Sequence, residues 1–262
     1  MSFNTLGLSS ELKKAIEDKG YTYPSDIQLQ AIPSIIKGND IMARAQTGTG
    51  KTAAFALPIL QKFQKDESKR RRVRALVLVP TRELASQVGD SFRSYGNNLR
   101  FRTSTIYGGV SINTQIDKLR KGGEIVVATP GRLLDHLDRK TLDLSELEVF
   151  VLDEADRMLD MGFIRDIKKI LTYLPKKKQN LLFSATFPKE IKALADSLLN
   201  SPKRIEVASN NSTVDKVTQV VYPVDKARKR ELLTYCIKDE GWFQVLVFSR
   251  TKHGANKLAG KL

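Results

Sequence analysis

The octapeptide AQTGTGKT at residues 45–52 decides the fold, because it fits the phosphate-binding pattern G-x-x-x-x-G-K-[ST] with Ala45 in place of the first glycine. Gly48 and Gly50 let backbone N–H groups turn inward around an anion, where a side chain would obstruct them. Lys51 can reach a phosphate as a point charge, and Thr52 can offer its hydroxyl to Mg²⁺. An apolar run precedes the octapeptide and a helical pattern follows it, which is the context that the motif requires.

The sequence around this loop alternates short β-branched runs with longer amphipathic stretches. The predicted strands are 41–45, 75–79, 101–106, 125–129, 149–152, 181–184 and 204–207, and the predicted helices are 51–63, 82–95, 111–121, 131–139, 162–174 and 188–199. Such alternation is typical of parallel strands joined by crossover helices, with both faces of the sheet covered. The sequence therefore predicts an α/β fold with a parallel sheet flanked by helices.

Turn and polar residues follow several of the predicted strands. Besides the phosphate loop, these segments are 80–82 (PTR), 129–132 (TPGR), 153–154 (DE) and 184–186 (SAT). In open α/β sheets, ligands bind outside the carboxyl ends of the strands. We therefore expect these segments to face one crevice.

The pair of acids after the strand at 149–152 is a second candidate for chemistry. Asp153 can hold Mg²⁺, usually through water, and Glu154 can orient or deprotonate an attacking water. Acidic residues also favour the first turn of a helix, which explains the pair about equally well when it is taken alone. In combination with the phosphate loop, Asp153 and Glu154 favour a nucleotide-hydrolysing site.

The composition excludes several classes of protein. The 262 residues are 41% hydrophobic, enough for a sizeable core, and no apolar run approaches the roughly 20 residues of a membrane span. The amino end has no apolar segment typical of a signal peptide. A single cysteine, Cys236, excludes an internal disulfide and a Cys-based metal cluster. We therefore expect a cytoplasmic protein without membrane contact.

The charge balance indicates a polyanionic partner. Lys and Arg number 44 against 29 Asp and Glu, a formal net charge of +15 at pH 7. Basic residues gather in KRRRVR (69–74), KKK (176–178) and KARKR (226–230). Each run alone is explained by a solvated loop or helix face. Jointly they favour nucleic acid as partner, although these runs need not be the place where it binds.

A break in composition follows residue 207. The stretch 208–216, ASNNSTVDK, is polar, lacks apolar periodicity and is typical of a linker. A strand at 219–224, a helix at 226–238 and a strand at 244–248 then predict the opening of a second α/β unit, too short for a core of its own. The predicted organisation is an ATP-binding domain over 1–207, a linker over 208–216 and the truncated start of a second domain over 217–262.

Residues 153–156 spell DEAD, the name-giving motif of the DEAD-box RNA helicases, and the chain resembles that family over essentially its whole length, most closely the bacterial RhlE-like branch. Segments similar to the family's other motifs occur in the family's order: GYTYPSDIQ (20–28), PTREL (80–84), Gly108 with Gly109, TPGR (129–132), SAT (184–186) and FSRT (248–251). The resemblance implies a RecA-like P-loop fold, ATP and Mg²⁺ as cofactors, and local unwinding of RNA.

The resemblance also implies the residues of an ATP site. Gln28, with Tyr21 before it, matches the adenine-recognising motif, and its amide can pair with the N6 and N7 edge of adenine, which would select ATP over GTP. Ser25 stands where the family more often has threonine. Phe3 matches an aromatic near the base, although packing of the amino end explains it almost equally well. The implied phosphate contacts are Ala45, Gln46, Thr47, Gly48, Thr49, Gly50, Lys51 and Thr52; the implied catalytic residues are Lys51, Asp153 and Glu154; and the implied Mg²⁺ ligands are Thr52 and Asp153.

Further matches imply contacts to RNA and a link between ATP and unwinding. The implied contacts to the RNA backbone are Pro80, Thr81, Arg82, Gly108, Gly109, Thr129, Pro130, Gly131 and Arg132, and the implied coupling residues are Asp156, Ser184, Ala185 and Thr186. Glycines and helix starts expose N–H groups, and arginines bind phosphate through two hydrogen bonds, so such contacts carry no base sequence.

Two late motifs of the family, one with an aspartate and one with the arginines that act on the γ-phosphate, have no match in this sequence. We therefore expect residues 1–262 to bind nucleotide but to be poorly active alone. The alternatives are a non-catalytic clamp on ATP and RNA, and a DNA-directed or transporter P-loop ATPase, which would share AQTGTGKT but not Gln28 with its flanks. The expected partner is RNA, and ribosomal or mRNA-decay assemblies are further candidates.

Overall fold

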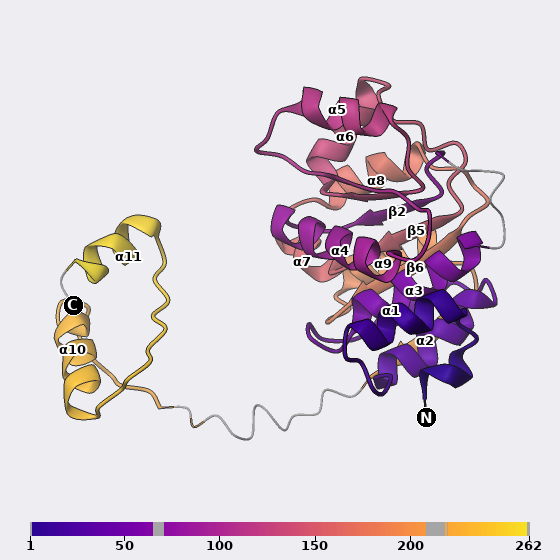
Figure 1. Ribbon diagram of the computed structural model, residues 1–262. Helices are drawn as coiled ribbons and strands as arrows, with labels where there is room; N and C mark the ends of the chain where they lie inside the picture. Colours follow the sequence, from indigo (N-terminus) through magenta and orange to yellow (C-terminus); the bar gives the residue numbers. More distant parts are fainter. Residues whose placement is uncertain (1, 65–70, 208–217, 219, 261–262) are drawn as a thin grey trace. The chain divides into compact units, whose positions relative to one another are not determined.

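The apolar runs predicted as strands between residues 41 and 207 pair side by side in one sheet, and every pairing is parallel (Figure 1). Their bounds are β1 Ile41–Arg44, β2 Ala75–Leu78, β3 Thr103–Ile106, β4 Ile125–Ala128, β5 Val149–Leu152, β6 Gln179–Ser184 and β7 Lys203–Glu206. The order across the sheet is β3-β4-β2-β5-β6-β1-β7. This description comes from a computed structural model, which describes residues 2–64, 71–207, 218 and 220–260.

Helices cover both faces of the sheet. They are the 3₁₀ helix η1 Phe3–Leu6 and the α-helices α1 Ser10–Asp18, α2 Asp26–Ile36, α3 Lys51–Gln64, α4 Arg82–Tyr95, α5 Ile112–Arg120, α6 Pro130–Asp138, α7 Ala155–Asp160, α8 Ile164–Thr172 and α9 Lys189–Leu198. On one face, α1 to α4 pack on alternate strand residues such as Val77 and Val151. On the other, α6 to α9 pack on the intervening residues such as Leu76 and Phe150.

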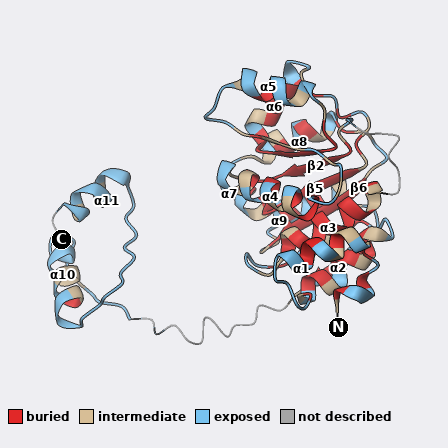
Figure 2. Cartoon of the chain, in the orientation of Figure 1, coloured by how far each residue is buried: buried red, intermediate tan, exposed pale blue. Residues whose placement is uncertain are grey.

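This two-sided packing explains why the sequences of the central strands β2, β4 and β5 are continuously apolar. β2, β4 and β5 are buried at every position (Figure 2). A strand with one solvated face would alternate polar and apolar residues, whereas a strand between two helical layers has no such face. The predicted α/β fold is therefore confirmed, and the carboxyl ends of all seven strands lie at one edge of the sheet.

The helices differ from the prediction in two places. α1 and α2 were not among the predicted helices, and α2 contains Pro33 in its interior, a residue that usually marks a helix boundary. The single helix predicted at 162–174 is preceded by the separate short helix α7. Gly162, with φ of +82°, forms the turn between α7 and α8.

The chain divides into two compact units, Met1–Ser209 and Asn210–Leu262. In the second, the predicted helix is present as α10 Lys229–Asp239, and a further helix, α11 Lys252–Ala259, follows. The two predicted strands are corrected: residues 220–224 and 244–248 have no strand pairing, and residue 219 lies outside the described part. A strand forms only against a partner, and Val221, Leu246 and Phe248 are instead exposed. The predicted linker 208–216 also lies outside the described residues.

Within the described part of the chain, no helix is both long and apolar enough to cross a membrane.

Candidate functional site

The phosphate loop lies between β1 and α3 at the carboxyl edge of the sheet. The loop turns at Gly48 and Gly50, whose φ angles of +86° and +89° are in the left-handed region that favours glycine. Helix α3 begins at Lys51, so its positive dipole end faces the loop. The backbone therefore presents donors and a dipole to an anion, as the motif predicts.

Lys51 and Asp153 form an ion pair beneath this loop. The Lys51 Nζ atom lies 3.7 Å from Oδ1 of Asp153, and both side chains are almost fully buried. Oδ1 of Asp153 also accepts the backbone N–H of Glu154 at 2.9 Å. Burial raises the pKa of Asp153 to about 6, and the positive charge of Lys51 opposes that rise. The pair holds two opposite charges out of solvent at the base of the site, an arrangement that costs desolvation energy.

Glu154 has a backbone conformation that its residue type rarely adopts. Its φ and ψ are 53° and 50°, in the left-handed region, at the point where β5 gives way to α7. The turn directs its carboxylate toward the phosphate loop, where Oε1 accepts the hydroxyl of Thr47 at 3.3 Å. The other oxygen accepts from the Arg157 guanidinium at 3.2 Å. Strained conformations of this kind cluster at functional sites.

Gln28 joins the start of α2 to the phosphate loop. Its amide oxygen accepts the backbone N–H of Ser25 at 3.0 Å, and its amide nitrogen donates to the carbonyl of Gly50 at 3.1 Å. Ser25 reaches the same loop through its hydroxyl, which donates to the carbonyl of Thr49 at 2.8 Å. A Cβ atom on Gly50 would lie 2.5 Å from the Gln28 amide nitrogen and would displace it, and the φ of +89° at Gly50 is strained for any other residue. Gln28 thus holds the loop and keeps one N–H and one lone pair for another partner.

These groups line one hollow of about 460 Å³. Among its lining residues are the predicted Tyr21, Gln28, Thr47, Gly48, Thr49, Gly50, Lys51, Thr52, Asp153 and Glu154. Phe3, Ala45 and Gln46 are not among them: Phe3 and Ala45 are buried in the core on the α1–α4 side of the sheet, and Gln46 is exposed.

Helix α4 forms one wall of this hollow, which the sequence analysis did not predict. Leu84, Gln87, Ser91 and Tyr95 line it, together with Tyr23 and Ser25. Gln87, Ser91 and Tyr95 are spaced four residues apart, which places them on one face of a helix. The four-residue spacing is visible in the sequence and predicts that the three side chains share a helix face. The sequence does not show that this face of α4 lies against the nucleotide hollow.

A second group of predicted residues gathers beside this hollow. A Cβ atom on Gly109 would lie 3.5 Å from an Nη atom of Arg82, so that guanidinium stands against the glycine loop. Arg132 donates from both Nη atoms to the carbonyl of Val110, each at 3.0 Å. Thr81 caps α4 by accepting the N–H of Leu84 at 3.2 Å. The loop 108–110 is therefore held between the starts of α4 and α6. Thr129 and Pro130 are buried, whereas Gly131 is exposed.

Asp156 links the start of α7 to the end of β6. Its Oδ2 atom accepts the backbone N–H and the hydroxyl of Thr186, both at 2.9 Å. The Ser184 hydroxyl accepts the N–H of Asp156 at 3.2 Å and donates to the carbonyl of Thr186 at 2.7 Å. Burial opposes ionisation here, but hydrogen bonds to the carboxylate, chiefly those from Thr186, outweigh it and lower the pKa of Asp156. Three of the four predicted coupling residues, Asp156, Ser184 and Thr186, therefore form one hydrogen-bonded cluster, and Ala185 lies between two of them in the chain.

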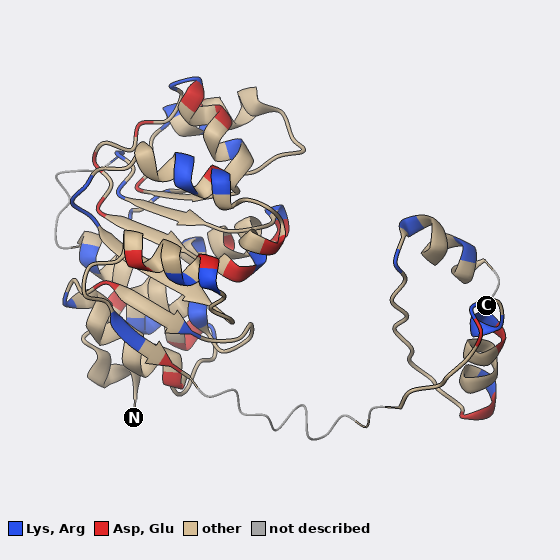
Figure 3. Ribbon diagram, turned by 180° about the vertical axis from the view of Figure 1, so that it is seen from behind, with Lys and Arg blue, Asp and Glu red and all other residues tan. Residues whose placement is uncertain are grey.

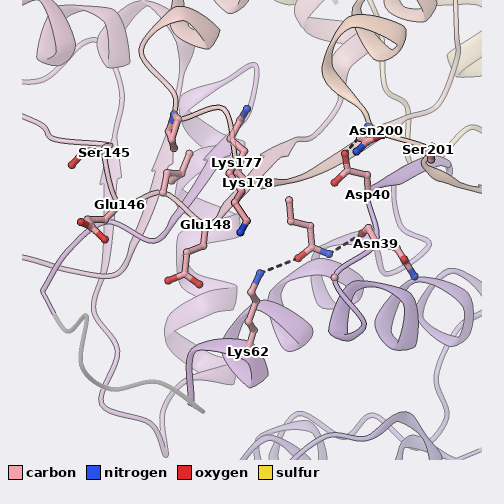
Figure 4. Close-up of a pocket in the computed structure, with 14 residues that line it drawn as sticks. Asn39, Asp40, Lys62, Ser145, Glu146, Glu148, Lys177, Lys178, Asn200 and Ser201 are labelled. Atoms are coloured by element: carbon pink, nitrogen blue, oxygen red, sulfur yellow. Dashed lines mark hydrogen bonds between the residues drawn. The ribbon is translucent and has the colours of Figure 1, made fainter.

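A larger hollow, of about 730 Å³, lies at the opposite edge of the sheet (Figure 4). Lys62 and Lys178 extend into it from two sides. Its floor is held by internal bonds, because Gln179 accepts from Lys62 at 3.3 Å and donates to the carbonyl of Asn39 at 2.8 Å. Asp40 similarly accepts from the backbone of Asn180 at 2.8 Å. These groups are occupied in holding loop to strand, so size alone does not make this hollow the functional site.

The donor set at the carboxyl edge suits a nucleotide with Mg²⁺ better than a metal held by protein alone. No group of three or more His, Cys, Asp or Glu side chains that could hold a metal occurs among the described residues. Thr52 and Asp153 offer one hydroxyl and one carboxylate to the hollow. Mg²⁺ typically takes one or two such oxygens and completes its shell with water and phosphate. The residues present therefore fit that ion.

A parallel sheet with a glycine-rich loop, a buried lysine and a strand-end aspartate at one edge defines a P-loop nucleotide-binding domain. The DEAD/DEAH box helicase family model matches residues 25–194, and the chain belongs to this family. Its fold is RecA-like. The assignment to the RhlE-like branch stays a prediction.

Individual relatives agree with the family. The chain is 44% identical over 257 residues to the DEAD-box ATP-dependent RNA helicase RhpA of Helicobacter pylori, an alignment that covers 98% of this chain and 51% of the relative. It is 43% identical over 261 residues to the helicase CshA of Bacillus cereus, covering 100% and 49%. The crystal structure of a DEAD box protein from Methanococcus jannaschii superposes with a TM-score of 0.74 at 39% identity, covering 100% of this chain and 69% of that one. The chain thus spans about half the length of the curated relatives that it matches.

Proposed function

We propose that residues 1–207 are the ATP-binding domain of an ATP-dependent RNA helicase. A linker over 208–216 would join it to the first part of a second RecA-like domain over 217–262. The observation that carries the proposal is the buried Lys51–Asp153 pair beneath the phosphate loop, on the same edge as the group formed by Arg82 and the loop 108–110. A nucleotide site and a site for a nucleic-acid backbone would then be neighbours, with α4 contributing to both.

In this proposal the chain's own groups bind and orient ATP. The N–H groups at Gly48 and Gly50 and the charge of Lys51 hold the phosphates, while Gln28 reads the adenine edge with the N–H and lone pair that remain to it. Mg²⁺, bound near Thr52 and Asp153, would neutralise charge on the phosphates. Glu154 holds the attacking water and takes its proton.

The RNA backbone would lie along the exposed N–H groups and guanidinium at the neighbouring site. Arg82 is exposed and pairs with Glu83 at 2.6 Å, so it can turn to a phosphate at the loss of only a surface ion pair. Arg132 is engaged with the carbonyl of Val110, and we therefore assign it the task of shaping the loop 108–110. The cluster of Asp156, Ser184 and Thr186 connects the catalytic turn to β6 and is the route by which occupancy of the ATP site would reach the RNA site.

The test of this function is ATP turnover with and without RNA. In a protein that carries both RecA-like domains, we expect RNA to stimulate hydrolysis. In residues 1–262 we expect ATP binding without that stimulation, because arginines supplied from elsewhere are worth about 10³–10⁵ in rate in comparable NTPases. Binding of ATP and RNA without turnover in the two-domain protein would support a clamp in place of a helicase.

Replacing Gln28 with alanine tests adenine recognition. We expect ATP to lose about 5- to 150-fold more affinity than GTP, since a bidentate contact discriminates between bases by about 1–3 kcal/mol. Both nucleotides should also lose some affinity equally, because Gln28 holds Gly50 in place. Titration of ATP and GTP by fluorescence or calorimetry separates the two effects. Ser25→Ala is the control, as it removes a bond to the same loop but no contact to a base. Equal losses for ATP and GTP in Gln28→Ala would leave Gln28 with a structural role alone.

A further inference from the structure

The proposed site does not account for the positive charge of the protein. At the carboxyl edge the cations are largely matched by acids, as in the ion pairs Lys51–Asp153, Arg82–Glu83 and Arg157–Glu154. Figure 3 shows Lys and Arg gathered instead on loops at the other edge of the sheet, where the strands begin. Part of the excess charge therefore lies away from the residues implied to contact ATP and RNA.

Three neighbouring loops at this edge are tied together by one buried carboxylate. The loops enter β2, β3 and β4, which are adjacent in the sheet. Glu124, only 3% exposed, accepts the backbone N–H of Arg71 at 2.8 Å through one oxygen and that of Arg102 at 2.9 Å through the other. Because Glu124 bonds to the backbone, it holds the two loops side by side while the arginine side chains stay outside.

The close contact of these loops requires unusual backbone conformations. A Cβ atom on Gly122 would lie 2.7 Å from Cβ of Arg71, so glycine is required there. Arg71 itself has φ of +69°, a conformation that is unfavourable for any residue with a side chain. Strain of this kind persists only where surrounding contacts impose it, and it is more frequent at functional positions.

The side chains on these loops form an exposed group of cations. We call Arg71, Arg72, Arg100, Arg102 and Lys121 the amino-edge cluster; all five are exposed. Arg72 pairs with Glu146 at 3.5 Å, and Arg102 donates to the carbonyl of Lys121 at 3.0 Å. Within the described ranges, the side chains of Arg71, Arg100 and Lys121 form no ion pair. The five cations of this cluster therefore outnumber the acids bonded to the same loops, Glu124 and Glu146.

We propose that the amino-edge cluster is a second surface for the RNA phosphate backbone. Guanidinium groups bind phosphate through two parallel hydrogen bonds, and four of the five cations are arginines. Adjacent strands are about 4.8 Å apart, so three loops span roughly 10 Å. Along the axis of a B-form duplex each strand has a phosphate about every 3.4 Å, so a strand in helical form presents about three phosphates over that span, and an extended strand fewer. The surface would hold RNA flanking the segment at Arg82, and it does not depend on the proposed catalytic cycle.

The test is RNA binding by a variant that removes charge without removing contacts. Arg71→Gln/Arg100→Gln/Lys121→Gln removes three side-chain charges that make no ion pair. The matched control, Lys14→Gln/Lys168→Gln/Lys192→Gln, removes three exposed charges from α1, α8 and α9. The probe is a fluorescein-labelled single-stranded RNA of about 30 nucleotides, longer than one site requires. Its affinity is measured between about 50 and 200 mM salt.

We expect the cluster variant to bind this RNA about tenfold more weakly at low salt. The log–log salt slope should fall in magnitude by about 2, since each phosphate contact in a single strand contributes about 0.7. The control should change affinity less than about twofold. If the triple variant melts at a lower temperature, Arg100→Gln alone should still lower the slope by about 0.7.

Three results would overturn the inference: no change in the cluster variant, equal losses in the control, or loss of binding to anionic phosphatidylserine vesicles with RNA binding intact. The last would assign the surface to a membrane. Arg82→Gln separates this inference from the proposed function. If Arg82→Gln weakens RNA binding and the cluster variant does not, the helicase proposal stands and the second surface falls. If the cluster variant weakens RNA binding and Arg82→Gln does not, only the second surface stands.

Discussion

Replacing Lys51 with alanine should reduce the affinity of residues 1–262 for ATP and ADP by about 30- to 5000-fold, the usual consequence of removing one member of a buried charge pair, about 2–5 kcal/mol. Lys51 lies at the first position of α3 and is 7% exposed, so its charge acts with little screening by solvent. The variant removes the cation that faces the phosphates and leaves the backbone donors at Gly48 and Gly50 unchanged.

The same substitution should leave the fold intact. Without Lys51, the buried carboxylate of Asp153 has no nearby positive charge, and its pKa, already about 6, should rise further. Protonation then relieves the cost of burying an unpaired charge. Circular dichroism and thermal melting would verify the fold, and fluorescence titration with a labelled ADP would measure affinity. Lys192→Ala, an exposed lysine on α9, is the matched control. An affinity within about twofold of the unmodified chain would remove Lys51 from the site.

The sequence was sufficient for the parts of this protein that follow from local pattern. Continuous apolar runs identified the central strands β2, β4 and β5 because both faces of the sheet are covered there, and the glycines of the phosphate loop identified the turn. In a parallel sheet, all strands end at one edge, so segments far apart in the chain, such as 45–52 and 153–154, could be expected at one site.

What the sequence could not provide depends on contacts between distant segments. Nothing in the order of residues indicates that Glu154 adopts a left-handed conformation, that Gln28 bonds to Gly50, or that Arg132 bonds to Val110. The strands predicted at 219–224 and 244–248 have the right composition but no partner strand in the described residues. Composition gives a preference for extended structure, and pairing decides whether a strand forms.

Glu154→Gln should separate binding from chemistry. The amide has the same shape as the carboxylate and keeps an oxygen that can accept from the hydroxyl of Thr47, now 3.3 Å away. It cannot accept a proton from water at neutral pH. We therefore expect nucleotide affinity within a few-fold of the unmodified protein and hydrolysis slower by about 10²–10⁴, the usual contribution of a positioned general base.

Single-turnover hydrolysis in the two-domain protein is the appropriate measurement, because it isolates the chemical step from product release. Glu190→Gln, an exposed acid on α9, is the matched control. Glutamine at position 154 has the same left-handed backbone conformation to adopt, so the backbone strain is equal in the variant and the unmodified protein. A difference in hydrolysis therefore does not come from the strain. If the conformation served only to start α7, the variant would hydrolyse ATP within a few-fold of the unmodified protein. A large loss with binding preserved would instead mean that the strained turn positions a base, because besides its basicity residue 154 loses only an ion pair with the exposed Arg157, which is worth little.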